Sequence, residues 1–392
     1  MRFKCVVLCL CLFTCTLLAV ASNAPSISQI GQFNPASFAP TGFGTVAISD
    51  STIAVAAAGD GYSYGAIYVY VKPSGGWTTM NPTATLSSTA CCSNGATLAI
   101  SADGSTIVAS VFSVGFGGGG AALVYVRPAS GWQDAAHETV VLVGGPYPGR
   151  YLAITPDGKT IVTTDYFYRP GKSYLYIFDR PAGGWTTMRP TNSILLSSQA
   201  TEIEAVAINS SGTVAVTNHA DLTVHVYQRS ASGIKQVATL SASDHSTSGA
   251  GLCCSLIIDK QTIVVEGFNS GDYTGKAYLF TMPSSGWADA TETAQLSAPN
   301  LGNFSFFGWD VAISGKAVLI GGLYTSAAYL YLEPAGGWQT TSQPNVTLLS
   351  SDLYQVHFGD SVAILGKTIL VGDPSAGANS SSTGDAFIYQ VQ

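Results

Sequence analysis

Short apolar segments alternate with polar, glycine-rich turns along most of the chain. The segments VAI (46–48), TIAVAA (52–57) and AIYVYV (66–71) show the pattern, and their β-branched and aromatic residues predict β-strands. Runs such as TIVV (262–265) are apolar at every position, which is typical of strands buried on both faces. Because no segment after the first twenty residues has a convincing helical period, the pattern predicts an all-β protein.

The same four-strand pattern recurs about every fifty residues, and a Gly-Trp pair marks its register. The Trp residues are separated by 55, 53, 102 and 51 positions, and the double gap contains a degenerate copy, Gly233-Ile234. The repeats are therefore continuous. The marker residues are Trp77, Trp132, Trp185, Trp287 and Trp338, and the repeats begin near Phe43, Asn94, Pro148, Glu202, Leu252, Phe307 and Phe358.

Seven repeat starts predict a seven-bladed β-propeller with four-stranded antiparallel blades, forming one domain over residues 22–392. The last repeat stops after three strands, whereas the extended segment SISQIGQF (26–33) stands alone near the other end. We therefore expect this N-terminal strand to complete the last blade, because closure of the ring removes an unpaired sheet edge. A linear solenoid with capped ends is the structural alternative.

Phe-Gly pairs begin several repeats, at Phe43-Gly44, Phe307-Gly308 and Phe358-Gly359, and a GDP segment (372–374) and recurrent PxGGW turns accompany them. In these features the chain resembles the FG-GAP repeat proteins, whose blades form the heads of integrin α-subunits and occur in secreted microbial proteins. The resemblance implies a propeller fold and a binding role.

Integrin-type blades often carry a calcium loop with acidic residues at alternate positions. The nearest segments of this chain hold one or two Asp without that spacing, so we expect no metal site and no cofactor. These segments are AAAGDGYSYG (56–65), FNSGDYTG (268–275) and GDPSAGANSSSTGDA (372–386).

The first residues have the pattern of a secretion signal. Arg2 and Lys4 precede an apolar run that ends in the small-residue motif Ala19-Val20-Ala21, which predicts a signal peptide over residues 1–21 and an extracellular protein. A retained membrane anchor is the alternative, and no later segment could span a bilayer.

Outside the predicted signal peptide, the cysteines form two adjacent pairs, Cys91-Cys92 and Cys253-Cys254. They belong to the second and fifth repeats, which a seven-membered ring places too far apart for a bond between the pairs. Each pair is therefore a candidate vicinal disulfide or a buried reduced pair.

Charged residues make up only 10% of the chain and the net charge is −7, with the Lys and Arg residues scattered. Phosphate binding needs a concentrated cationic surface, so this composition excludes a nucleic-acid partner. In a eukaryotic source, four Asn-X-Ser/Thr sequons would be candidate N-glycosylation sites, namely Asn209, Asn303, Asn345 and Asn379.

No catalytic motif stands out, because the five histidines fall in different repeats or on different strands without metal-ligand spacing. We predict that the protein is not an enzyme. One enzyme alternative remains open: quinone-dependent alcohol dehydrogenases, which are also propellers, can carry an adjacent-cysteine disulfide beside their cofactor, although the other residues of that family are not visible in this sequence.

The loops between second and third strands are rich in aromatic residues, and the four-strand order places them on the same face as the loops between blades. Exposed aromatic rings bind partners well because they bury a large area at small entropic cost. We expect a recognition or adhesion module for a protein or a glycan, with a structural surface or matrix protein as an alternative. The candidate ligand-binding residues are Tyr62, Tyr64, Phe112, Phe116, Tyr166, Phe167, Tyr168, Phe268, Tyr273 and Tyr324.

Overall fold

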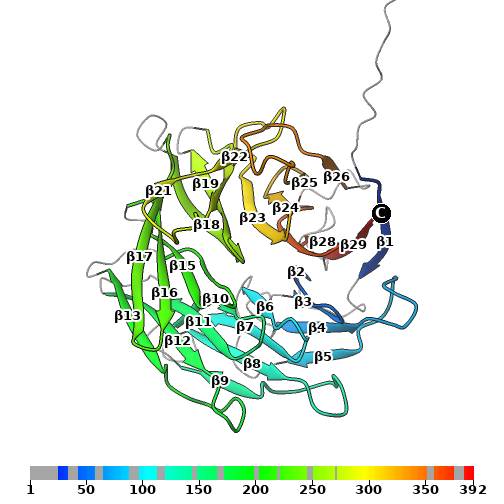
Figure 1. The fold of residues 1–392 in the computed structure, drawn as a ribbon. Coiled ribbons are helices and arrows are strands. Elements are labelled where there is room, and N and C mark those ends of the chain that lie inside the picture. The colour runs from blue at the N-terminus through cyan, green and yellow to red at the C-terminus, as the bar shows by residue number, and fades with distance from the viewer. Residues whose placement is uncertain are drawn as a thin grey trace, which may run out of the picture.

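The computed structural model shows seven β-sheets arranged as blades in a closed ring, as Figure 1 shows. The prediction of a seven-bladed all-β propeller is confirmed. The structure describes residues 25–33, 43–57, 65–87, 97–112, 120–143, 148–165, 172–197, 203–218, 221–244, 250–269, 272–350, 357–374 and 384–392. The predicted signal peptide lies outside these residues.

The strands follow the repeat order, with the innermost strand of each blade first in the chain. Blade 1 contains β2 (Phe43–Ile48), β3 (Thr52–Ala57), β4 (Ala66–Val71) and β5 (Ala84–Ser87). Blade 2 contains β6 (Leu98–Ile100), β7 (Thr106–Phe112), β8 (Gly120–Val126) and β9 (Val140–Leu142). Blade 3 contains β10 (Pro148–Ile154), β11 (Thr160–Asp165), β12 (Ser173–Asp179) and β13 (Asn192–Ser197).

The second half of the ring has the same order, with one addition. Blade 4 contains β14 (Val206–Ile208), β15 (Thr213–Asn218), β16 (Thr223–Ser230) and β17 (Gly233–Ser241), and β21 (Ala290–Thr291) joins it as a fifth, parallel strand. Blade 5 contains β18 (Ala250–Asp259), β19 (Thr262–Asn269), β20 (Lys276–Thr281) and β22 (Ala294–Leu296). Blade 6 contains β23 (Phe307–Ser314), β24 (Ala317–Gly322), β25 (Ala327–Leu332) and β26 (Val346–Leu349). Blade 7 contains β27 (Ser361–Leu365), β28 (Thr368–Asp373), β29 (Asp385–Val391) and β1 (Ile27–Phe33).

The core consists of apolar layers between neighbouring blades. Every residue of β3 and of β28 is buried, which explains why their central segments IAVAA (53–57) and ILV (369–371) are apolar rather than alternating. Ile67 of blade 1 and Ile107 of blade 2 belong to one such layer. Each blade therefore buries its two faces against its neighbours.

The N-terminal strand closes the ring, as the sequence predicted. β1 pairs antiparallel with β29, in a register that places Ile27 opposite Val391 and Phe33 opposite Ala386. In Figure 1 the C-terminus lies beside β1. The edge that β29 would otherwise expose is thereby covered.

The Phe-Gly pairs have a packing role at the start of β23 and just before β27. Gly308 and Gly359 adopt φ values of 102° and 104°, a region that favours glycine. A Cβ added to Gly359 would lie 2.4 Å from the backbone oxygen of Ala327 in the preceding blade. Glycine thus permits the close contact of one blade with the next.

The Gly-Trp pairs anchor a contact that we call the Gly-Trp clip: the residue two positions after the Trp accepts a hydrogen bond from the outer strand of the preceding blade. Asp134 Oδ1 accepts from Thr85 N at 2.8 Å, and Asp289 Oδ1 accepts from Thr239 N at 2.8 Å. The next residue forms a parallel bridge to the same strand, and in blade 5 this bridge lengthens into β21. The Trp residues of blades 1, 2, 3 and 6 are buried beside these clips.

Blade 4 lacks the clip because Gly233-Ile234 begins β17 directly after a tight turn. An ion pair joins blades 3 and 4 instead. Arg229 Nη2 lies 2.8 Å from Asp179 Oδ2, and Arg229 Nη1 donates to Thr160 Oγ1 at 3.1 Å. A charged contact therefore takes the place of the missing motif at this joint.

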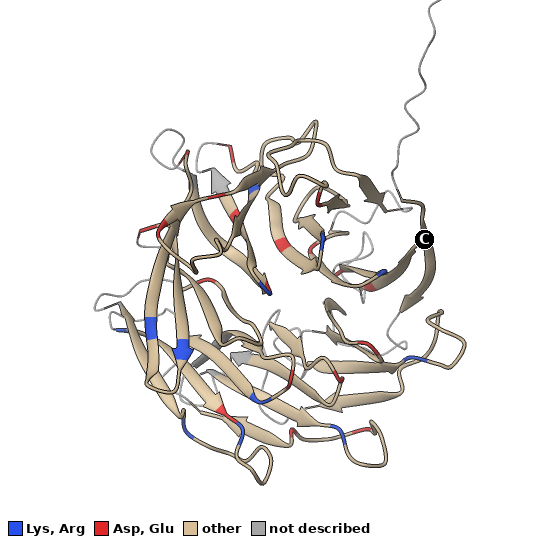
Figure 2. Ribbon diagram, in the orientation of Figure 1, with Lys and Arg blue, Asp and Glu red and all other residues tan. Residues whose placement is uncertain are grey.

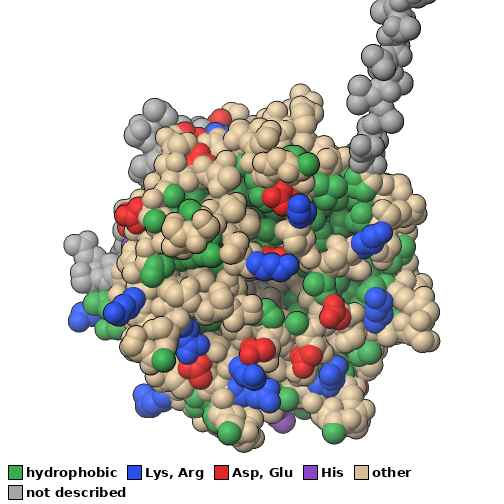
Figure 3. Space-filling model, viewed as in Figure 1, with side chains coloured by type: hydrophobic (Ala, Val, Ile, Leu, Met, Phe, Trp, Pro, Cys, Tyr) green, Lys and Arg blue, Asp and Glu red, His purple; other side chains and the backbone are tan. Residues whose placement is uncertain are grey.

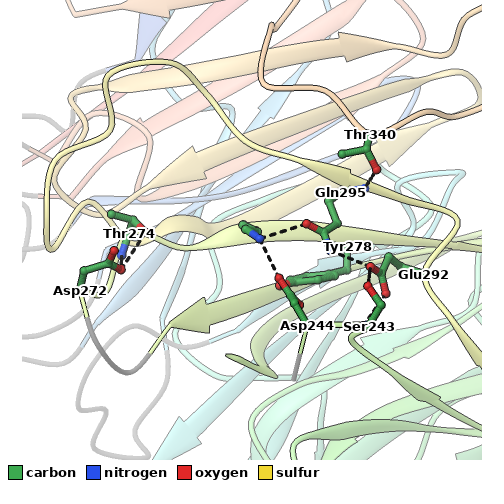
Figure 4. A network of polar contacts seen from close by, with 9 residues as sticks. Ser243, Asp244, Asp272, Thr274, Tyr278, Glu292, Gln295 and Thr340 are labelled. Carbon is green, nitrogen blue, oxygen red and sulfur yellow. Dashed lines mark hydrogen bonds and ion pairs between the residues drawn. The ribbon is translucent and has the colours of Figure 1, made fainter. Parts of the chain in front are cut away.

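A polar network joins blades 4 and 5, as Figure 4 shows. Asp244, which follows β17, lies 2.7 Å from Lys276 Nζ and accepts from the Tyr278 hydroxyl at 2.9 Å. Ser243 donates from its backbone N–H and its hydroxyl to the Glu292 carboxylate, at 2.9 and 2.6 Å. Because these contacts join elements of two blades, we assign the network a structural role.

Candidate binding site at the channel mouth

The innermost strands of all seven blades line a central channel of about 1150 Å³. Its wall is mostly apolar, with the Val-Ala-Ile type segments of each repeat facing it. Carboxylate, sulfur and aromatic side chains from blades 4 to 7 line one part of this wall. They are Glu204, Cys254, Trp309, Asp310 and Asp360.

An exposed group of aromatic rings borders this part of the channel. Phe304, Trp309 and Tyr324 have 56, 39 and 55% of their surface exposed, although large aromatic side chains are normally buried. Phe306 contacts both Trp309 and Tyr324, with ring centroids 6.0 and 6.1 Å apart. We call these rings, together with Tyr273, the aromatic platform.

Tyr273 extends the platform to the loop between β19 and β20. Its ring stacks on Phe304 at a centroid distance of 5.3 Å and lies 5.6 Å from Phe306. The platform therefore combines a loop of blade 5, the connection between blades 5 and 6, and a turn of blade 6. No single repeat contains all of its members.

Backbone hydrogen bonds hold the platform in place. Phe304 N donates to Asp272 O at 2.8 Å, and Phe306 N donates to Tyr273 O at 3.0 Å. Tyr273, Phe304 and Phe306 all have positive φ values, between 44° and 63°, which non-glycine residues adopt at a cost that surrounding contacts must offset. Such strained, fixed backbone is a feature of ligand-binding segments.

Three carboxylates from three blades lie in or behind the same wall. Burial raises the pKa of Asp310 to about 6. Burial, together with the carboxylates of Asp373 and Asp310, raises the pKa of Asp360 to about 9. Burial and the carboxylates of Glu204 and Asp310 hold the pKa of Glu266 well above its usual value. The wall is therefore a region where negative charge is poorly solvated.

Asp310 is fixed by contacts with the two neighbouring blades. Its Oδ2 accepts from Val362 N at 2.8 Å and its Oδ1 accepts from the Ser255 hydroxyl at 3.2 Å. His357 Nδ1 lies 2.8 Å from Asp360 Oδ2, whereas Asp360 Oδ1 has no hydrogen-bond partner among the described residues. His357 in turn packs edge-on against Tyr324 at 5.5 Å. A series of side-chain contacts through Tyr324 and His357 thus connects the aromatic platform to Asp360.

Cys253 and Cys254 are bonded to each other in the wall of the channel. Cys253 is buried, and Cys254 reaches the channel and lies 3.4 Å from Glu204 Oε2. The two sulfurs and Glu204 form a compact group that could hold a metal ion only as thiolates, and the disulfide removes that capacity. Cys91 and Cys92 lie outside the described residues.

Of the ten aromatic residues predicted to bind a ligand, the structure brings Tyr273 and Tyr324 together. Phe112 and Phe268 lie in β7 and β19, where their side chains are outside the described part. The sequence reasoning missed Phe304, Phe306 and Trp309, although Trp309 is the one Trp out of the repeat register. The other predicted residues, Tyr62, Tyr64, Phe116, Tyr166, Phe167 and Tyr168, are outside the described residues.

The candidate glycosylation sites differ in accessibility. Asn303 and Asn345 are exposed. Asn209 is buried, and its side-chain amide donates to Lys260 O at 2.8 Å, so the folded chain does not present this side chain to solvent. Its carboxamide oxygen caps the turn before β15 instead. Asn379 lies outside the described residues.

Charged residues are scattered along the ribbon around the ring in Figure 2. On the face shown in Figure 3, basic and acidic groups are interspersed over the blades. Within the described residues, no helix is long and apolar enough to cross a membrane.

The fold is similar to that of several solved structures. The WD40 domain of coronin from Toxoplasma gondii has a TM-score of 0.57 at 10% identity, covering 94% of this chain and 89% of that chain. BamB from Moraxella catarrhalis has a TM-score of 0.51 at 9% identity, covering 94% of this chain and 98% of that chain. A candidate 6-phosphogluconolactonase from Bacteroides uniformis has a TM-score of 0.54 at 12% identity, covering 78% and 87%.

Neither a family model nor a curated protein sequence matches the chain. At such low identities the structural likeness establishes the β-propeller fold, and function has to be argued from the site.

Proposed function

We propose that the protein is a secreted, non-enzymatic recognition module that binds a protein or glycan ligand through the aromatic platform. The observation that carries the proposal is the exposure of Phe304, Trp309 and Tyr324, which are grouped around Phe306, with Trp309 in the channel wall. Rigid rings contribute large contact area with few rotatable bonds, and the hydrogen-bonded backbone beneath them reduces the ordering cost of binding. The Phe-Gly pairs support placing the chain near the FG-GAP propellers.

The proposal is tested by asking whether the platform contacts a ligand where the protein acts. A photoreactive phenylalanine analogue at Tyr324 is cross-linked to material from the outside of the source cells, and in parallel the protein is applied to immobilised oligosaccharides. We expect adducts or saccharide binding that Trp309→Ser abolishes. The matched control places the analogue at Leu349, an exposed apolar residue on the outer strand β26.

Equal adduct yields from positions 324 and 349, or saccharide binding unaffected by Trp309→Ser and Phe304→Ser, would contradict a recognition role for this surface. Circular dichroism and melting curves of each variant show that the fold is retained.

One observation favours a second candidate function. The bonded Cys253–Cys254 pair reaches the channel wall, the kind of position in which a propeller enzyme holds a redox cofactor. A rise in the melting temperature with pyrroloquinoline quinone, absent in the Cys253→Ser/Cys254→Ser variant, would favour this enzyme over the recognition module.

A further inference from the structure

Glu204 and Cys254 lie side by side in the channel wall, although they belong to different blades. Each occupies the position two residues before the apolar triplet of its inner strand, VAI (206–208) in blade 4 and LII (256–258) in blade 5. Equivalent positions of neighbouring repeats lie next to each other around the ring, and Cys254 Sγ is accordingly 3.4 Å from Glu204 Oε2. Because both residues line the channel, a small ion that enters it meets both groups.

A β-bulge brings Cys254 to this position. The register of β18 against β19 shifts between Cys253 and Leu256, so that Cys254 and Ser255 have no opposite residue on β19. Cys253 is buried, whereas Cys254 reaches the channel. Bulges of this kind redirect single side chains and are frequent beside functional sites.

The contact between Cys254 and Glu204 has no chemical explanation while the cysteines are oxidised. A disulfide sulfur has no proton to donate to a carboxylate, whereas a thiol is a donor and a thiolate is a metal ligand. The sulfurs of Cys253 and Cys254 and a carboxylate oxygen of Glu204 all lie within 4.8 Å of one another. That spacing is short enough for the three groups to share one ion once the S–S bond is broken.

The set of ligands favours a soft divalent cation of the Zn²⁺ class. Thiolates select Zn²⁺ over hard cations, and carboxylates are common additional ligands of zinc. Calcium-type loops, which the sequence lacks, serve hard cations, so their lack says nothing against a thiolate site. Three protein ligands are typical of zinc sites that keep a fourth position for water or another small ligand.

We propose that reduction of the Cys253–Cys254 disulfide creates a Zn²⁺ site formed by the two thiolates and the Glu204 carboxylate. Two molecules of a small thiol supply the two electrons. The first attacks Cys254 Sγ, which reaches the channel, and Cys253 leaves as a thiolate that takes up a proton. The second attacks the mixed disulfide, so that Cys254 becomes a thiol and the reductant departs as its own disulfide.

Zn²⁺ then replaces the two thiol protons, which are released to the solvent. The disulfide is thus the closed state of the site, and the reduced pair is the open one. This site does not use the rings of the aromatic platform, so the inference goes beyond the proposed function and does not depend on it.

The test compares the oxidised and the reduced protein by titration with Co²⁺, a spectroscopic substitute for Zn²⁺ whose thiolate complexes absorb in the near ultraviolet. A phosphine reduces the protein and is removed before the titration, because a thiol reductant would itself bind the metal. We expect the reduced protein to bind Co²⁺ with thiolate absorption and release of protons, and Zn²⁺ to displace the Co²⁺. The oxidised protein should show no such absorption.

Residue-specific alkylation distinguishes this pair from Cys91 and Cys92. The reduced, metal-free protein is treated with iodoacetamide, and mass spectrometry should find Cys254 modified because it reaches the channel. A saturating concentration of Zn²⁺ should protect it. This measurement needs no substitution, so it decides the question even where a variant fails to fold.

Variants identify the ligands. Glu204→Gln should weaken Zn²⁺ binding by about tenfold or more, since the loss even of a group that only hydrogen-bonds a ligand has an effect of that size. Glu333→Gln is the matched control, because Glu333 pairs with Lys316 and is not among the residues that line the channel, and it should leave the affinity unchanged. Cys253→Ser/Cys254→Ser should abolish the thiolate absorption, and melting curves show which variants fold.

Three results would overturn the inference. They are no thiolate absorption after reduction, alkylation of Cys254 at the same rate with and without Zn²⁺, and equal Zn²⁺ affinity of the unmutated protein and Glu204→Gln. Thiolate absorption that persists in Cys253→Ser/Cys254→Ser would place the metal at other cysteines and would contradict the inference equally.

Discussion

The backbone N–H of Gln392 donates a hydrogen bond to the backbone oxygen of Ser26 at 2.9 Å, and the Ser26 hydroxyl donates to Gln392 Oε1 at 2.7 Å. The Ser26–Gln392 contacts lie within blade 7, and a second contact joins the inner strands of blades 1 and 7, where Val46 N donates to the Ser361 hydroxyl at 3.1 Å. Segments more than 300 residues apart are thereby fastened both at the rim and near the channel. The closure of the ring depends on this joint, because all other neighbouring blades are also connected directly by the polypeptide chain.

Removing the anchor of β1 should weaken the whole ring. Phe33 is fully buried and stacks on Tyr70 at a centroid distance of 4.2 Å. Phe33→Ala should lower the free energy of unfolding by about 3–5 kcal/mol, the usual cost of deleting a buried aromatic ring. Urea denaturation measures this, with Gln32→Ala as the neighbouring control. A loss as small as that of the control would mean that β1 does not close the ring.

The Gly-Trp clip predicts an effect at the next blade. Asp134→Ala removes the acceptor for Thr85 N and should cost about 1–2 kcal/mol, because a backbone donor loses its partner. Hydrogen-exchange measurements should show faster exchange of the backbone amide of Thr85, which lies in β5 of the preceding blade. Unchanged protection of that amide would contradict the assigned role of the clip.

The ion pair between blades 3 and 4 should be weaker than a buried contact. Arg229 and Asp179 have side chains 29 and 39% exposed, so solvent screens their attraction. A double-mutant cycle with Arg229→Ala and Asp179→Ala should give a coupling of about 0.5–1 kcal/mol that falls with added salt. A coupling indifferent to salt would argue against an electrostatic joint.

Stability should rise as the pH falls from about 9 towards 5. The pKa of Asp360 is raised to about 9 and that of Asp310 to about 6, while the pKa of Glu266 is also raised. The folded state therefore binds more protons than the unfolded state in this range, and protonation favours folding. His357 opposes the trend below its normal pKa, because burial lowers its pKa in the folded state.

Melting temperature as a function of pH measures the effect. The groups facing Asp360 include Asp310, Asp373 and His357, and those facing Glu266 include Glu204 and Asp310. Asp360→Asn should flatten the profile between pH 6 and about 9, whereas Asp50→Asn should not. A profile that rises with pH would show that these carboxylates are ionised and solvated in the folded protein.

Glycan occupancy should follow accessibility. On expression in a eukaryotic secretory pathway, mass spectrometry should find glycans at Asn303 or Asn345 and none at Asn209 in folded material, because the Asn209 amide is buried and hydrogen-bonded. A glycan on Asn209 in a protein with a normal melting curve would contradict the turn geometry.

The repeating pattern alone was enough to predict much of the architecture. Fully apolar segments such as TIVV (262–265) indicate strands buried on both faces, and the missing fourth strand of the last repeat indicates closure by residues 26–33. These predictions succeeded because strand period and repeat length are local properties, and a ring is the arrangement that leaves no edge exposed.

The candidate site was predicted only in part. Tyr273 and Tyr324 stood out because their loops are aromatic-rich, but Trp309 and Phe306 lie next to a repeat start, where the sequence suggests packing. The fold brings these four rings together with the Asp360 carboxylate across three blades. The sequence by itself thus determined the blade, its repeat number and its closure, because backbone pairing follows local pattern. Tertiary structure alone decided which loops meet at the channel and which carboxyl groups become buried beside one another, because such contacts depend on how neighbouring blades pack in space.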